Sequence, residues 1–65
     1  MKDFTPYIGK TCRVWFAPHT VSGVITGVSP GNWLNMTILD DLLRGEVIEI
    51  RCEVINAISV MRGKT

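Results

Sequence analysis

The stretch from residue 33 to residue 41 alternates in the way of a β-strand with one buried face. One side carries the apolar residues Leu34, Met36 and Ile38. The other side carries Trp33, Asn35, Thr37 and Leu39. This pattern predicts that the apolar side packs against the hydrophobic core. It leaves an aromatic ring and an amide, two positions apart, on the side that faces away from that core.

Four further stretches read as short strands, over residues 11–17, 21–28, 46–52 and 55–61. Residues 18–20 interrupt the first two, because proline cannot donate a hydrogen bond to a ladder. Glycines at positions 23 and 27 indicate a strongly bent strand or a close backbone approach. Five short strands with closely spaced turns and almost no helix predict an all-β fold, a small and strongly bent five-stranded barrel.

The segments outside these strands are short. Residues 2–8 are expected to form about one helical turn across one end of the sheet, with Gly9 ending it. Leu42 and Leu43 fall in a predicted loop, where two leucines are unusual and favour contact with a neighbour. Residues 62–65 are expected to be a frayed tail.

The chain has 65 residues, which suffice for one domain whose core spans about residues 8–61. A domain of this size buries only about 60% of its unfolded surface and is marginally stable alone. The two cysteines are too few for a disulfide scaffold. A metal site is not expected either, because the chain has one histidine and no Cys-x-x-Cys pair. By elimination, oligomerisation is the expected source of additional stability.

The net charge of +1 predicts no strong non-specific attraction to nucleic acid or to anionic membranes. Any nucleic-acid function must therefore come from the local placement of a few groups. No apolar run is long enough to span a bilayer, and the first three residues begin no signal peptide. We therefore expect a cytoplasmic protein without membrane contact.

The sequence offers little for catalysis, so no enzymatic activity and no cofactor are expected. Cys12 and Cys52 fall on inward positions, where cysteine acts as a small hydrophobic residue. His19 lies in a predicted turn, and nothing in the sequence places it beside either thiol. Asp40 and Asp41 are adjacent, so they point to opposite faces. One is expected to cap a turn and the other to be solvated.

Three outward residues remain as a candidate binding site: Trp33, Asn35 and Arg51. An aromatic ring can stack on a nucleobase, an amide can read a base edge, and a guanidinium can stack or bind phosphate. The alternative is structural. Trp33 then packs on a neighbouring strand or subunit, and Arg51 pairs with Glu49 or Glu53.

Residues 50–58 read Ile-Arg-Cys-Glu-Val-Ile-Asn-Ala-Ile. They resemble the second signature of the Sm and Sm-like RNA-binding proteins (the LSm and Hfq-type family), which has Ile-Arg-Gly followed by two spaced aliphatic residues. The elements of the first signature occur in the right order, as Gly9-Lys10, Gly23 and the segment Asn35-Met36-Thr37-Ile38-Leu39-Asp40. The resemblance covers about residues 8–61. The chain departs from the family at Ser29, where the family has aspartate, and at Cys52, where it has glycine. The loop before Asn35 is also two residues longer than usual.

The resemblance implies a short N-terminal helix on an SH3-like barrel of the Sm type. Such barrels form homo-oligomeric rings of about five to seven subunits by pairing strand four with strand five of the next subunit. The expected interface residues are Ile48, Ile50, Ile58 and Val60. Rings of this family bind uridine- or adenine-rich single-stranded RNA in RNA metabolism and regulation.

By position, Trp33 matches the stacking residue of the family, Asn35 the base-reading asparagine, and Arg51 the arginine that holds the base and the loop. A second interpretation remains open. The chain could be an SH3-like assembly or protein-interaction module without RNA binding, which the near-neutral charge and the expected exposure of Trp15, Leu42 and Leu43 favour.

Overall fold

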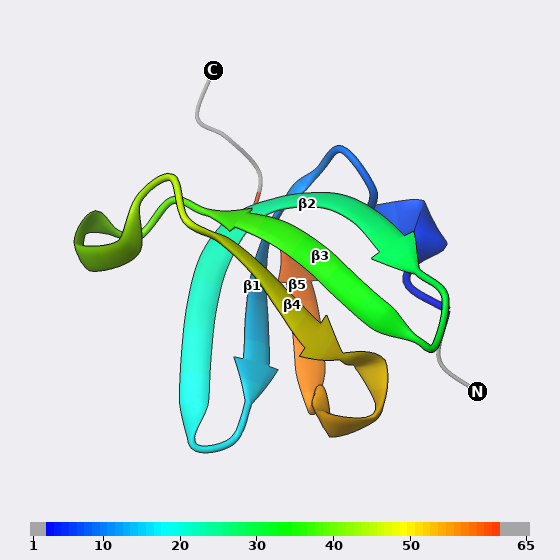
Figure 1. Ribbon diagram of the computed structural model, residues 1–65. Helices are drawn as coiled ribbons and strands as arrows, with labels where there is room; N and C mark the ends of the chain where they lie inside the picture. The colour runs from blue at the N-terminus through cyan, green and yellow to red at the C-terminus, as the bar shows by residue number, and fades with distance from the viewer. Residues whose placement is uncertain (1–2, 62–65) are drawn as a thin grey trace.

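The computed structural model describes residues 3–61, which form one antiparallel sheet of five strands (Figure 1). The strands are β1 (Thr11–Phe16), β2 (His19–Ser29), β3 (Trp33–Ile38), β4 (Val47–Arg51) and β5 (Ala57–Val60). Three short 3-10 turns accompany them: η1 (Thr5–Tyr7), η2 (Asp41–Leu43) and η3 (Cys52–Val54). The predicted all-β fold with five strands is confirmed. No helix in the described range is long and apolar enough to cross a membrane.

The strand order is β4-β3-β2-β1-β5, so the last two strands in the sequence lie at opposite edges of the sheet. Neighbouring strands pair antiparallel throughout. Between residues 3 and 61 no ladder joins β4 to β5. The observed fold is therefore a five-stranded antiparallel sheet, and the closed barrel of the prediction is not observed.

The long strand β2 bends so that its two halves serve two neighbours (Figure 1). Its first half pairs with β1 and its second half with β3. Gly23 belongs to both ladders, opposite Cys12 and Ile38. A Cβ added there would collide with the backbone carbonyl of Thr37. The register shifts between Ile25 and Gly27, as at a β-bulge. The expected bend and close backbone approach are confirmed.

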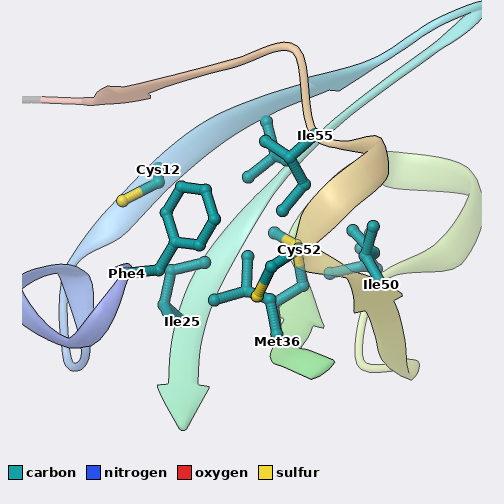
Figure 2. Close-up of a cluster of buried hydrophobic side chains, with 10 residues drawn as sticks. Phe4, Cys12, Ile25, Met36, Ile50, Cys52 and Ile55 are labelled. Atoms are coloured by element: carbon teal, nitrogen blue, oxygen red, sulfur yellow. The ribbon is translucent and has the colours of Figure 1, made fainter. Parts of the chain in front are cut away.

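The core lies inside the bend of the sheet and is entirely apolar (Figure 2). Its buried members are Phe4, Cys12, Val14, Ile25, Leu34, Met36, Ile38, Ile50, Cys52 and Ile55. The inward side of the opening strand is buried as predicted. Both cysteines are buried as predicted, and neither forms a disulfide. Phe4 from the N-terminal turn also belongs to the core.

The N-terminal turn is helical, as expected, but of the 3-10 type. The Asp3 carboxylate accepts hydrogen bonds from the Thr5 hydroxyl at 2.7 Å and from the Thr5 N–H at 3.0 Å, and both lower the pKa of Asp3. Gly9 ends the turn with φ at +86°. Its N–H donates to the Ile25 carbonyl at 2.7 Å, which ties the turn to β2.

Several predicted boundaries were wrong. β2 begins at His19 rather than at residue 21, because His19 and Thr20 pair with Phe16 and Trp15. The turn before it is therefore only two residues long and contains the cis peptide bond Ala17–Pro18.

The other boundaries changed for similar reasons. β3 ends at Ile38, after which residues 41–43 form the turn η2. β5 begins at Ala57, since η3 occupies residues 52–54 and places the buried Ile55 ahead of the strand. The tail predicted for residues 62–65 lies outside the described residues.

Candidate nucleic-acid interface

The register of β3 and β4 places Trp33 directly opposite Arg51. The guanidinium carbon of Arg51 lies 5.7 Å from the centroid of the Trp33 ring, within the range of a cation–π contact. The two residues come from strands separated by a long connection. The ladder, not the sequence spacing, therefore brings them together.

The turn before β3 sets the position of the indole. Gly31 and Asn32 both have positive φ, at +89° and +66°. A Cβ at Gly31 would lie 3.4 Å from Cδ1 and 3.5 Å from Nε1 of Trp33, so the edge of the ring packs over the glycine. The Cys52 N–H donates to the Asn32 carbonyl at 2.8 Å. The loops on either side of the site are thus joined directly.

Asn35 lies on the same side of β3 as Trp33, and its amide is held on one side only. Its Nδ2 donates to the Ser29 Oγ at 2.6 Å. Its Oδ1 is buried and has no hydrogen-bond partner within residues 3–61. A buried acceptor without a partner is costly, so a ligand that donates a hydrogen bond there would gain the missing interaction. Gly27, opposite Asn35 in the ladder, leaves the amide uncrowded.

The charged side chains at the site are one guanidinium and two carboxylates. Arg51 forms an ion pair with Glu53 at 3.2 Å, and Glu49 lies opposite Asn35 in the register. The partner of Arg51 is thus one of the two carboxylates named in the structural alternative. Both side chains of the pair are more than half exposed, so the pair contributes at most about 1 kcal/mol. A phosphate or base could displace Glu53 at little cost.

The predicted site residues therefore meet at one end of the sheet: Trp33, Asn35 and Arg51. Sequence reasoning missed the roles of Ser29 and Gly31, which hold the amide and the indole. Ser29 stood out only as a departure from the family pattern. Its pairing opposite Trp33 depends on the length and shape of the turn, which composition does not specify.

The predicted interface residues lie on the two edge strands, β4 and β5. Ile48 and Ile58 are half-buried, and Val60 is exposed. Ile50 is buried in the core, so at its position only the backbone of β4 is available to a neighbour.

The described residues contain no constellation for metal binding. Between residues 3 and 61, no three His, Cys, Asp or Glu side chains gather as metal ligands would. Burial raises the pKa of the Cys12 thiol, which the nearby Lys10 ammonium only partly offsets, so the thiol stays protonated at neutral pH. His19 packs against the ring of Phe16 with 5.5 Å between centroids.

The two aspartates that are adjacent in the sequence each interact with another residue. Asp40 accepts the Ser22 N–H at 3.0 Å, so it ties the end of β3 to β2. Its side chain makes no capping hydrogen bond to η2. Asp41 forms an exposed ion pair with Arg44.

Comparisons with protein-family models, with curated proteins and with solved structures found no match for this chain. The resemblance to the Sm proteins therefore rests on the motifs and their spacing.

Proposed function

We propose that this chain is a non-enzymatic Sm-type subunit that binds short single-stranded RNA, rich in uridine or adenine. The observation that supports this most is the grouping of Trp33, Arg51 and Asn35 on one side of the β3–β4 ladder. The three side chains supply a stacking surface, a cation and an unsatisfied acceptor, which are the groups that single-stranded nucleic acid requires.

Each residue has a distinct role in this proposal. The Trp33 indole stacks on a base, while Gly31 supports the edge of the ring. The Oδ1 of Asn35 accepts a hydrogen bond from an N–H on the edge of that base, with Ser29 holding the other end of the amide. Arg51 leaves Glu53 to contact phosphate, or remains stacked beside the base.

The proposal includes assembly into a homo-oligomeric ring of about five to seven subunits in which β4 of one subunit pairs with β5 of the next. Two facts support it. Both strands are edges of the sheet in residues 3–61, and an unpaired edge is a template for pairing with another chain. Val47 on β4 and Val60 on β5 also leave apolar surface exposed at these edges. Pairing would complete the barrel-like sheet between neighbouring subunits.

Fluorescence anisotropy with labelled oligo-uridine and oligo-adenine tests the RNA proposal. Because stacking contributes about 1–3 kcal/mol per base, we expect Trp33→Ala to weaken binding by about 5- to 150-fold. Trp15→Ala is the matched control, since Trp15 is half-buried on β1, two strands away in the sheet. Arg51→Gln and Arg13→Gln form a second matched pair, because Arg13 is also on β1.

The outcomes separate clearly. Loss of affinity in the Trp33 and Arg51 variants, with folded controls that bind normally, would support the site. Absence of binding by the wild type to both oligonucleotides would exclude the RNA proposal. Equal losses of RNA affinity in the Trp15 and Trp33 variants would show that RNA does not bind specifically at Trp33.

A second candidate is an assembly module of SH3-like type that binds no RNA. The observation that favours it is the exposed apolar surface around η2, where Leu42 is almost completely solvent-exposed. The expected exposure of Trp15 is only partly observed, because Trp15 is half-buried between Thr20 and Ala57. Assembly without RNA binding in the experiment above would favour this candidate.

A further inference from the structure

The guanidinium of Arg51 has a partner on each of two sides. It lies 5.7 Å from the centroid of the Trp33 ring, and it forms an ion pair with Glu53 at 3.2 Å. The ring holds it through a cation–π contact, while the carboxylate binds the N–H groups that a phosphate would otherwise contact. The cation of the candidate site therefore already has an anionic partner within the chain.

The backbone of η3 fixes the position of Glu53. Cys52 precedes it and is buried, and the Cys52 N–H donates to the Asn32 carbonyl at 2.8 Å. Ile55 follows two residues later and is also buried in the core, and its N–H donates to the Cys52 carbonyl at 3.2 Å (Figure 2). Because the residues on both sides are anchored, the turn holds the Glu53 carboxylate within reach of Arg51.

A second carboxylate lies near the same cation. Glu49 is two residues before Arg51 on β4, so it points to the same face of the sheet. It lies opposite Asn35 in the ladder, beside the amide that is proposed to read the base. A phosphodiester that approaches Arg51 therefore meets two negative charges that repel it. An uncharged base that approaches Trp33 is not repelled in this way.

We propose that Glu53 competes with the phosphates of RNA for Arg51, so that the site selects its ligand by the base and gains little from the phosphodiester backbone. This inference rests on the proposed function, because it concerns the same site. Glu53 is then a specificity-determining residue. It lowers the affinity for any polyanion, whereas a ligand with a base still stacks on Trp33. The net charge of +1 adds no strong attraction of its own.

The exposure of the ion pair sets the size of the effect. The side chains of Arg51 and Glu53 are 57% and 66% exposed, so solvent screens their attraction. An exposed pair of this kind changes an equilibrium constant by up to about fivefold. Each phosphate contact steepens the fall of log affinity with log salt concentration by about 0.7 for a single strand. Removing the Glu53 charge should therefore give a modest gain in affinity together with a steeper salt dependence.

Anisotropy titrations with oligo-uridine at several salt concentrations test this competition. We expect Glu53→Gln to bind about two- to fivefold more tightly than the wild type, with a salt slope steeper by about 0.7. The same substitution should give no gain in an Arg51→Gln background. Asp41→Asn is the matched control, since it removes a carboxylate from an exposed ion pair with Arg44 at η2, outside the site. It should bind RNA as the wild type does.

The outcomes distinguish this inference from the proposed function. Equal affinities and salt slopes for the wild type and Glu53→Gln, with RNA bound by both, would overturn the competition and leave the RNA proposal standing. Equal gains in Glu53→Gln and Asp41→Asn would also overturn it, because they would reflect overall charge. Absence of RNA binding by the wild type and by Glu53→Gln would overturn the RNA proposal and this inference with it.

Dimethyl phosphate gives a readout that needs no RNA, since it carries one phosphodiester charge and no base. Its titration at constant ionic strength is followed by the NMR signal of the Arg51 Nε–H group. We expect Glu53→Gln to respond at a concentration about two- to fivefold lower than the wild type. Equal responses of the two proteins would overturn the competition even where RNA binds.

Discussion

Gly23 shows how a single residue controls the shape of this sheet. It pairs with Cys12 on one side and with Ile38 on the other, at the point where β2 passes from one neighbour to the next. The space for its Cβ is occupied by the backbone of Thr37, which cannot move without opening the ladder. Gly27 stands in the same strand with more room, since the nearest atom to an added Cβ is the Asn35 Nδ2 at 3.9 Å.

The two glycines should respond differently to substitution. We expect Gly23→Ala to lower the free energy of unfolding by about 2–4 kcal/mol, because the backbone must shift to accept the methyl group. Gly27→Ala should change it by less than about 1 kcal/mol. Urea titration followed by circular dichroism measures both. Similar losses for the two variants would show that the bend of β2 does not depend on the close approach at Gly23.

At the scale of the elements, the two edge strands differ from the three inner ones. β4 and β5 each have one paired neighbour, while β1, β2 and β3 have two. Val60 on β5 and Val28 on β2 are exposed to nearly the same extent, at 38% and 37%. Comparing substitutions at these two positions therefore separates the role of the β5 edge from the effect of an exposed valine.

Val60→Lys should prevent the proposed β4–β5 pairing, because edge lysines oppose strand addition and must be desolvated at an interface. We expect its native mass to fall below that of the wild type, with the circular dichroism spectrum unchanged. Val28→Lys, in the half of β2 that pairs with β3 and outside the proposed β4–β5 contact, should retain the mass of the wild type. If both variants keep that mass, the edges are not the assembly surface.

At the scale of the whole molecule, the small core links the proposed assembly to the stability of the fold. Within residues 3–61, ten buried residues form the core. A chain of this size is marginally stable alone. The proposed pairing of the edges between chains would stabilise the folded state by mass action.

The thermal unfolding midpoint of the wild type should therefore rise with protein concentration, on the order of a few degrees for each tenfold increase. Val60→Lys should unfold at a midpoint independent of concentration. Scanning fluorimetry over a hundredfold range measures both. A wild-type unfolding midpoint that does not change with protein concentration would show that the monomer is stable without assembly.

The alternation in the sequence was sufficient to predict which side chains of residues 33–39 point inward. Leu34, Met36 and Ile38 are fully buried. Cys12 and Cys52, which were also predicted to point inward, are fully and almost fully buried. This succeeded because the pleat of a strand has a period of two wherever the strand lies. The strand boundaries were less predictable, since His19 and Thr20 join β2 only through their partners in β1.

The tertiary structure decided which distant residues meet. Arg51 lies over Trp33, and Ser29 holds Asn35, only because of the ladder register and the turn that contains Gly31 and Asn32. A shift of one residue would have turned each of these side chains to the other face. The sequence by itself determined the faces of the strands, through local geometry. Only the three-dimensional fold determined the candidate site, because it depends on hydrogen-bonded pairing between segments far apart in the chain.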